Sequence, residues 1–188
     1  MTTETIALKP LAPEQWNSTL KTVLDDMKGR PLNIHRLLAH HPALLQAWWS
    51  FRNYSVKGGA LTARQRELAI LRVAHTLQSS YEWESHVERG FAAGLSLQEI
   101  ERVKAGPGDP DWTRAESLLL RVVDDCLAHS RITPDTQALL GDHFSPQQLL
   151  DLIAIQSMYQ MLGAVIGTWG LELDEFIELP EGYQRDLT

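Results

Sequence analysis

The chain has 188 residues, of which 44% are hydrophobic, so it is long enough to bury a core without a disulfide or a structural metal. Its single cysteine, Cys126, excludes an internal disulfide framework, a CxxC redox pair and a zinc site built mainly from thiolates. A net charge of −7 and a pI near 5.4 oppose broad contact with nucleic-acid phosphates, which requires clustered Lys and Arg. These features predict a cytoplasmic protein whose partners are small molecules or other proteins.

Apolar residues recur at helical rather than alternating spacing along almost the whole chain, and Pro, Gly, Ser and Thr divide this pattern into segments. Helices are predicted over 13–28, 42–57, 62–77, 80–93, 96–105, 112–129 and 145–161, with shorter ones after 33 and 133. We predict an all-α fold in which residues 1–30 are an N-terminal helical extension and residues 31–180 form one domain. The tail from Glu178 is expected to be irregular.

The N-terminal sequence has no basic region followed by an apolar run, as a signal peptide or membrane anchor would have. The apolar stretches elsewhere are expected to be too short, and too often interrupted by charged residues, to span a bilayer. The sequence therefore predicts no membrane role.

Polar side chains are grouped on two adjacent predicted helices. Ser79, Glu82 and His86 are spaced i, i+3 and i+7, which places them on one helix face if the helix begins early enough. Glu67, on the preceding helix, lies on the same stripe as apolar residues. A core-facing carboxylate needs a partner, so we expect a hydrogen bond from His86, Ser79 or a bound ligand. Two carboxylates near one imidazole would also have separated pKa values, which suits proton transfer near neutral pH.

Structural explanations exist for the same residues. Glu82 and His86, at i and i+4, can form a solvent-exposed pair that contributes little stability. Glu67 lies in the charged run 64–67 and can be exposed there. A third alternative is a metal site, because two carboxylates and an imidazole form a common ligand set.

The motif E-L-x-I-L-R-V-A, followed by S-x-Y-E-W-x-x-H, resembles the core motif of the carboxymuconolactone decarboxylase/AhpD-like superfamily. In the AhpD pattern a Glu precedes CxxCxxxH, and here Glu67 matches that Glu, Ser79 and Glu82 replace the two cysteines, and His86 matches the His. Without the cysteines the chain cannot cycle a disulfide, so AhpD-type peroxidase activity is expected to be missing. The resemblance therefore favours the carboxymuconolactone decarboxylase branch.

The resemblance implies an AhpD-like orthogonal helical array that forms a homo-oligomer, as a dimer, trimer or hexamer. It also implies a cofactor-independent lyase or decarboxylase acting on a small cyclic or unsaturated carboxylic acid. Glu67, Glu82 and His86 are the predicted catalytic residues: His86 or Glu82 supplies the proton, and Glu67 orients His86. The main alternative is a non-catalytic or ligand-sensing oligomer of the same fold, and a thiol-dependent peroxidase is less favoured. Neither a cofactor nor a metal is implied.

Four further residues are predicted to bind the substrate. Ser79 shares the polar face, Tyr81 and Trp83 offer rigid aromatic surface for a pocket wall, and Arg72 offers a planar fork that matches a carboxylate. Core packing for the aromatic residues and an exposed salt bridge for Arg72 are the alternatives. Cys126 is expected to be a packing residue, because no basic partner can be assigned to it locally.

Overall fold

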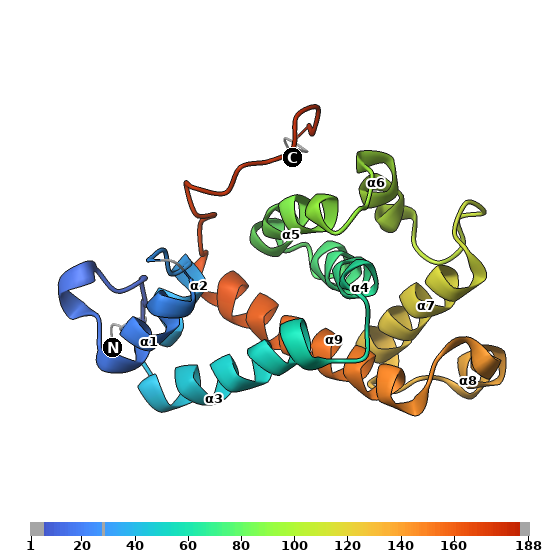
Figure 1. The fold of residues 1–188 in the computed structure, drawn as a ribbon, viewed down its shortest axis with the longest axis horizontal. Coiled ribbons are helices and arrows are strands. Elements are labelled where there is room, and N and C mark those ends of the chain that lie inside the picture. Colours follow the sequence, from blue (N-terminus) through green and yellow to red (C-terminus); the bar gives the residue numbers. More distant parts are fainter. Residues whose placement is uncertain (1–5, 28, 185–188) are drawn as a thin grey trace, which may run out of the picture.

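The structure is a computed structural model that describes residues 6–27 and 29–184. In this part of the chain all regular elements are helices, which confirms the all-α prediction (Figure 1). The α-helices are α1 (Ser18–Asp26), α2 (Asn33–Leu38), α3 (Pro42–Asn53), α4 (Ala63–Thr76), α5 (Ser80–Ala92), α6 (Leu97–Ala105), α7 (Arg114–His129), α8 (Pro134–Leu140) and α9 (Pro146–Trp169). A π-helical turn, Tyr54–Gly58, extends α3, and short 3₁₀ turns occupy Pro13–Gln15 and Gly141–His143.

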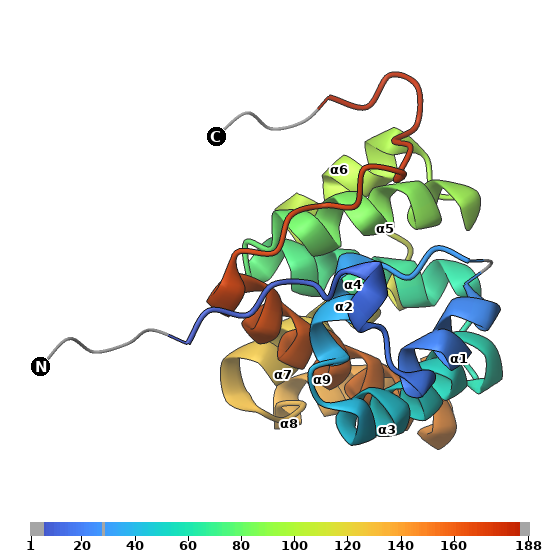
Figure 2. The same cartoon turned by 90° about the vertical axis from the view of Figure 1, so that its left-hand side faces the viewer.

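Helix α4 is the centre of the array and packs on α5, α6, α7 and α9. Its apolar side chains meet those of α7 and α9 in the core, where Leu68, Leu71 and Leu152 are fully buried. Helices α1, α2 and α3 pack mainly on one another and lie together at one end of the molecule (Figures 1 and 2). The C-terminal segment after α9 runs back along α5 (Figure 2).

Two helix boundaries differ from the prediction. The segment predicted as one helix over 13–28 is divided, because Asn17 is extended and caps α1 by accepting a hydrogen bond from the Leu20 amide. Lys28, its predicted end, lies outside the described residues. Helix α9 continues eight residues beyond the predicted end at Met161, and it stops where Gly170 takes a left-handed conformation with φ of 60°.

The expectation that every apolar stretch is too short to span a bilayer is wrong for α9. This helix has 24 residues and a mean hydropathy of 1.5 over its most apolar window, so its length and composition are sufficient to cross a membrane. However, 44% of that window is buried inside the protein, where α9 packs on α4 and α7. The core helix of a soluble protein passes the same test, so α9 is weak support for a membrane span.

Candidate functional site

The α4–α5 hairpin brings Glu67 and His86 together. Thr62 and Gln65 form the predicted capping box at the start of α4, and Ser79 caps α5, so both helices are fixed in register. The Glu67 Oε2 atom lies 2.6 Å from His86 Nδ1. The side chains of both residues are largely buried. His86 is therefore the partner that the core-facing Glu67 was expected to need.

The neighbours of His86 determine its tautomer. An Arg guanidinium can only donate, so the Arg89 Nη1 atom, 3.0 Å from His86 Nε2, donates to that nitrogen. The proton of the neutral ring then lies on Nδ1 and is donated to Glu67. Burial lowers the pKa of His86, and although Glu67 opposes this shift, the positive charge of Arg89 adds to it. The imidazole is consequently neutral and uses both nitrogens.

Glu82 is also buried, but unlike Glu67 its carboxyl group has no partner among the described residues. Its residue surface is 2% exposed, and neither carboxyl oxygen has a hydrogen-bond partner among the described residues. Burial raises the pKa of Glu82 from its usual 4.5 to about 8, with a small opposing effect of Ser79. Glu82 is therefore a carboxylic acid rather than a carboxylate at neutral pH. Because Glu82 and His86 are both buried, the explanation of an exposed i, i+4 pair is wrong.

The raised pKa of Glu82 makes a testable contribution to stability. The folded state binds a proton at Glu82 that the unfolded chain releases near pH 4.5, so the free energy of unfolding should fall as pH rises toward about 8. The buried imidazoles have the opposite effect on the free energy of unfolding, which they make rise with pH. Burial lowers the pKa of His35 from 6.5 to about 3 and also lowers the pKa of His86, so the unfolded chain binds more protons at these rings than the folded protein does. From about one pH unit above 6.5 these imidazoles are almost entirely neutral in both states, and the effect of Glu82 is the larger one.

Denaturant unfolding from about one pH unit above 6.5 up to pH 8 should therefore show stability declining with pH, by less than the roughly 1.4 kcal/mol per pH unit that a whole proton would give. The Glu82→Gln variant should lose most of this decline. An equally steep decline in the variant would show that another group causes it.

Helix α9 leaves space for the Glu82 carboxyl group at Gly163. A Cβ atom there would lie 3.1 Å from Glu82 Oε2 and 2.9 Å from Leu77 Cδ1. Gly163→Ala should therefore destabilise the protein by about 1 kcal/mol or more through overpacking, measured by urea unfolding. Gly167→Ala is the matched control, because nothing lies within 4 Å of its Cβ position, and helix propensity should make it stabilising by about 0.5–1 kcal/mol. Equal stabilisation by both substitutions would show that Glu82 and Leu77 can move aside.

A small cavity of about 40 Å³ lies between α2, α3, α5 and α9. Its polar lining consists of His35, Trp48, Arg52, Tyr81, Glu82, Ser85, His86, Arg89 and Tyr159. Among the described residues, the buried side-chain polar atoms without a hydrogen-bond partner are Trp48 Nε1, both Glu82 oxygens and Ser85 Oγ. All of them belong to residues of this one lining, which is the pattern expected of a site that binds a polar ligand.

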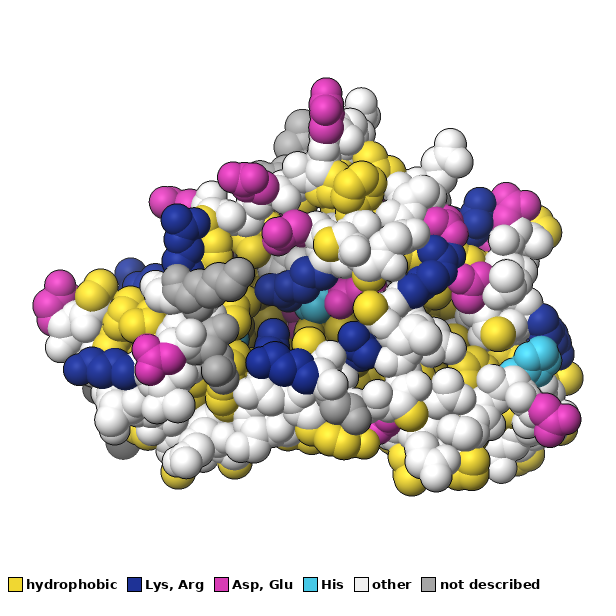
Figure 3. Space-filling view, viewed as in Figure 1, with side chains coloured by type: hydrophobic (Ala, Val, Ile, Leu, Met, Phe, Trp, Pro, Cys, Tyr) yellow, Lys and Arg dark blue, Asp and Glu magenta, His cyan; other side chains and the backbone are white. Residues whose placement is uncertain are grey.

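Positive charge gathers near the middle of the molecular face in Figure 3. There, Lys and Arg side chains surround a hollow in which a histidine and an acidic side chain are visible. Arg52 and Arg89 are the cations that line the cavity. In a chain with a net charge of −7, this concentration of positive charge favours an anionic ligand.

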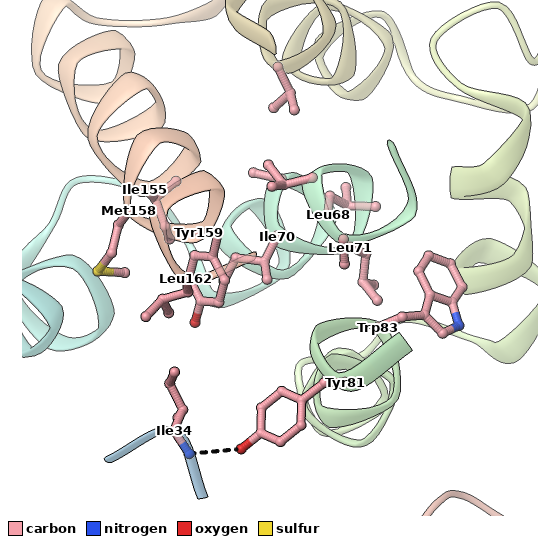
Figure 4. Close-up of a cluster of buried hydrophobic side chains, with 14 of the residues drawn as sticks. Ile34, Leu68, Ile70, Leu71, Tyr81, Trp83, Ile155, Met158, Tyr159 and Leu162 are labelled. Atoms are coloured by element: carbon pink, nitrogen blue, oxygen red, sulfur yellow. Dashed lines mark hydrogen bonds between the residues drawn. The ribbon is translucent and has the colours of Figure 1, made fainter. Parts of the chain in front are cut away.

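The predicted substrate-binding residues do not all reach this cavity. Tyr81 lines it and donates its hydroxyl proton to Asp174 Oδ2 at 2.7 Å, while the Ile34 amide contacts the same hydroxyl at 3.5 Å (Figure 4). Trp83 points away from Tyr81 in Figure 4 and lines a different, more open pocket of about 730 Å³, together with Ser79 and Arg72. Ser79 is the cap of α5 rather than a member of the helix face that carries Glu82 and His86.

Arg72 is held by structural contacts. Its Nε and Nη2 atoms donate to the two carboxyl oxygens of Asp124 at 2.6 and 3.0 Å, and its Nη1 atom donates to the carbonyls of Val103 and Lys104. This guanidinium therefore ties α4 to α6 and α7. These contacts favour a salt bridge as the role of Arg72 over the binding of a substrate carboxylate.

Several cavity residues were missed by sequence reasoning, namely Arg89, Ser85, Arg52, His35 and Tyr159. Arg89 follows His86 by three residues and Ser85 follows Glu82 by three, so helical spacing carries a signal for these two. The others come from α2, α3 and α9, whose approach to α5 no local pattern reveals. Cys126 does not line the cavity, and burial raises the pKa of its thiol. In residues 6–27 and 29–184 no group of three or more His, Cys, Asp or Glu side chains is arranged to hold a metal ion.

The motif helices lie within a recognised family segment. Residues 42–125 match the carboxymuconolactone decarboxylase family. The matched segment contains both motif helices, α4 and α5, so this similarity agrees with the resemblance that the motif carries. No curated protein sequence matches the chain.

Solved structures of two peroxidase-related proteins and a debrominase have the same fold over most of the chain. An uncharacterised peroxidase-related protein from Silicibacter sp. TM1040 superposes with a TM-score of 0.74 at 16% identity, covering 94% of this chain and 97% of that one. The AhpD-core peroxidase-related protein from Ralstonia eutropha JMP134 gives 0.72 at 18% identity, with 91% and 95% covered. A cysteine-to-alanine variant of the debrominase Bmp8, in complex with 2,3,4-tribromopyrrole, gives 0.73 at 11% identity, with 91% and 93% covered. At these identities the likeness establishes the AhpD-like fold.

Proposed function

We propose that this protein is a cofactor-independent lyase, of the decarboxylase type, that acts by acid–base chemistry on a small cyclic or unsaturated carboxylic acid in the cavity between α2, α3, α5 and α9. The observation that supports this most is the convergence of the buried, partnerless polar atoms of Trp48, Glu82 and Ser85 on one lining that also contains Arg89. A purely structural cluster would have its polar atoms satisfied internally. A ligand that enters the cavity would supply the missing partners.

Arg89 is the residue that we assign to the substrate carboxylate. Its hydrogen bond to His86 uses one of five N–H donors, and no carboxylate within the described residues lies within 4.0 Å of its guanidinium. A charge-assisted, bidentate bond to a ligand carboxylate suits the remaining donors. The Glu67–His86 pair fixes the position of this guanidinium, because the neutral imidazole presents its lone pair to Nη1.

Glu82 is the residue that we assign as the acid. When a carboxyl group leaves as CO₂, the C–C bond breaks and its electron pair passes into a conjugated carbonyl, which becomes an enolate. The proton of Glu82 is then transferred to carbon, and the carboxylate left behind recovers a proton from water. His86 is less suited to this role, because its Nδ1 proton is committed to Glu67 and its Nε2 atom already accepts from Arg89.

Substrate entry requires the cavity to enlarge. A volume of about 40 Å³ accommodates ordered water but not an organic acid of several carbons. Trp48 and Arg52 line the cavity from α3, which packs mainly with α1 and α2 rather than with α4. We therefore expect α3 to move outward when the cavity enlarges.

The fold alone does not identify the reaction as a decarboxylation, because the debrominase Bmp8 has the same fold. The test is therefore CO₂ release by the purified protein from a panel of unsaturated and lactone-type carboxylic acids, beginning with carboxymuconolactone. Release from at least one acid is the expected result. Tight binding of such acids without turnover would support the alternative of a ligand-sensing protein, and neither binding nor turnover would overturn the assignment of the cavity.

We also propose that the chain is cytoplasmic and assembles with copies of itself. Leu150 and Ile153 leave apolar surface exposed on α9, with exposed fractions of 67% and 37%, which a second copy can cover. Light scattering after size exclusion should show a dimer, trimer or hexamer. A monomer at micromolar concentration would contradict this proposal.

A further inference from the structure

The cavity lining that contains Glu82 also includes hydrogen-bond donors that carry no charge. Trp48 Nε1 is a donor only, and it has no partner among the described residues. Ser85 Oγ, from α5, is likewise buried without a partner. A buried donor without a partner destabilises a folded protein, so two such donors in one cavity indicate that the cavity binds a hydrogen-bond acceptor.

His35 adds to the same part of the lining. Its Nδ1 atom accepts the Leu32 amide at 3.2 Å, so the neutral ring carries its proton on Nε2. The ring contacts both neighbouring indoles, with centroids 5.6 Å from Trp48 and 5.2 Å from Trp49. Burial and the charge of Arg52 keep the pKa of His35 near 3, and the imidazole therefore stays uncharged across the physiological range. The ring contacts also restrict the orientation of the Trp48 indole.

We propose that Trp48 and Ser85, with the His35 ring in contact with Trp48, form a second subsite that takes an uncharged carbonyl oxygen of the ligand whose carboxylate binds to Arg89. This inference rests on the proposed function, whose reaction already requires a carbonyl group that takes the electron pair, and it assigns the binding of that carbonyl oxygen to Trp48 and Ser85. Neutral donors suit a neutral acceptor, because they satisfy its lone pairs without leaving a net charge buried. Their hydrogen bonds also become stronger as the carbonyl oxygen turns into an enolate oxygen, because negative charge develops on that atom in the proposed reaction.

Matched small acids can test this subsite without any turnover. Levulinate carries a carboxylate and a ketone, whereas valerate has the same chain length and only the carboxylate. We expect isothermal titration calorimetry to show levulinate binding about tenfold more tightly than valerate to the wild-type protein. Trp48→Phe removes the N–H and keeps an aromatic ring, so it should remove most of this preference and leave valerate binding unchanged. Trp169→Phe is the matched control, because the Trp169 indole donates to the Ile6 carbonyl, outside the cavity.

Ser85→Ala provides a second variant that is independent of the Trp48 indole. It should weaken levulinate binding severalfold and, because it removes an unsatisfied buried hydroxyl, should leave Tm unchanged or raised. A clear fall in Tm with an unchanged preference for levulinate would show that Ser85 is merely structural and would overturn its part in the subsite.

The remaining outcomes separate this inference from the proposed function. Equal affinity for levulinate and valerate would overturn the carbonyl subsite and leave the carboxylate site standing. Tighter binding of glutarate than of levulinate would show that the second position takes a charged group, which also overturns it. No binding of any of the three acids would overturn both proposals.

Discussion

The Glu82→Gln variant should lose about a hundredfold to ten-thousandfold in kcat for any acid that the protein converts. Gln is close in size to Glu and is neutral, as Glu82 is at neutral pH because its pKa is about 8. The substitution therefore preserves the packing against Gly163 and the local charge, but it removes the proton that is transferred to carbon. Initial rates of CO₂ release at neutral pH measure this loss, and the wild-type rate should fall as pH rises through about 8.

The control for this experiment is Glu88→Gln, which makes the same chemical change on the same helix. Glu88 does not line the cavity, and its substitution should leave kcat unchanged within a factor of two. If Glu82→Gln retained wild-type kcat and the same decline above pH 8, the acid would have to be another group. His86 would then be the next residue to replace.

The helices were predictable where capping residues and apolar periodicity agree. Thr62 with Gln65, and Ser96 with Glu99, mark the starts of α4 and α6 in the sequence and form the same capping boxes in the structure. The extension of α9 was missed because Gly163 and Gly167 weaken helix propensity. Tertiary packing overrides that preference, since Gly163 lets the helix pass close to Glu82.

Part of the candidate site was also accessible from the sequence. The position of Glu67 on an apolar stripe required a buried partner, and the adjacent helix offered His86. Helical geometry also explains where this reasoning failed: Tyr81 and Trp83 are two residues apart on α5, so they cannot face the same pocket. Trp48, by contrast, reaches the cavity from α3 through tertiary packing, which no local spacing encodes.

The Arg89→Gln variant should bind carboxylate ligands about tenfold to a hundredfold more weakly, because it loses a charge-assisted hydrogen-bonding fork. Calorimetry with levulinate and valerate measures this loss directly, and both acids should be affected equally since both carry the carboxylate. NMR titration should in addition show a raised pKa of His86, because the charge of Arg89 contributes to lowering it.

Arg121→Gln changes the net charge by the same amount on the exposed surface of α7 and should alter neither quantity. This control distinguishes a direct contact between Arg89 and the ligand carboxylate from the general attraction between the protein's positive charges and an anion. Salt would screen the general attraction in both variants. A purely structural Arg89 would give a different result: the pKa of His86 would rise while the affinity for both acids stayed at the wild-type value. Arg89 would then position His86 and bind no substrate, and the carboxylate would have to be placed on Arg52 instead.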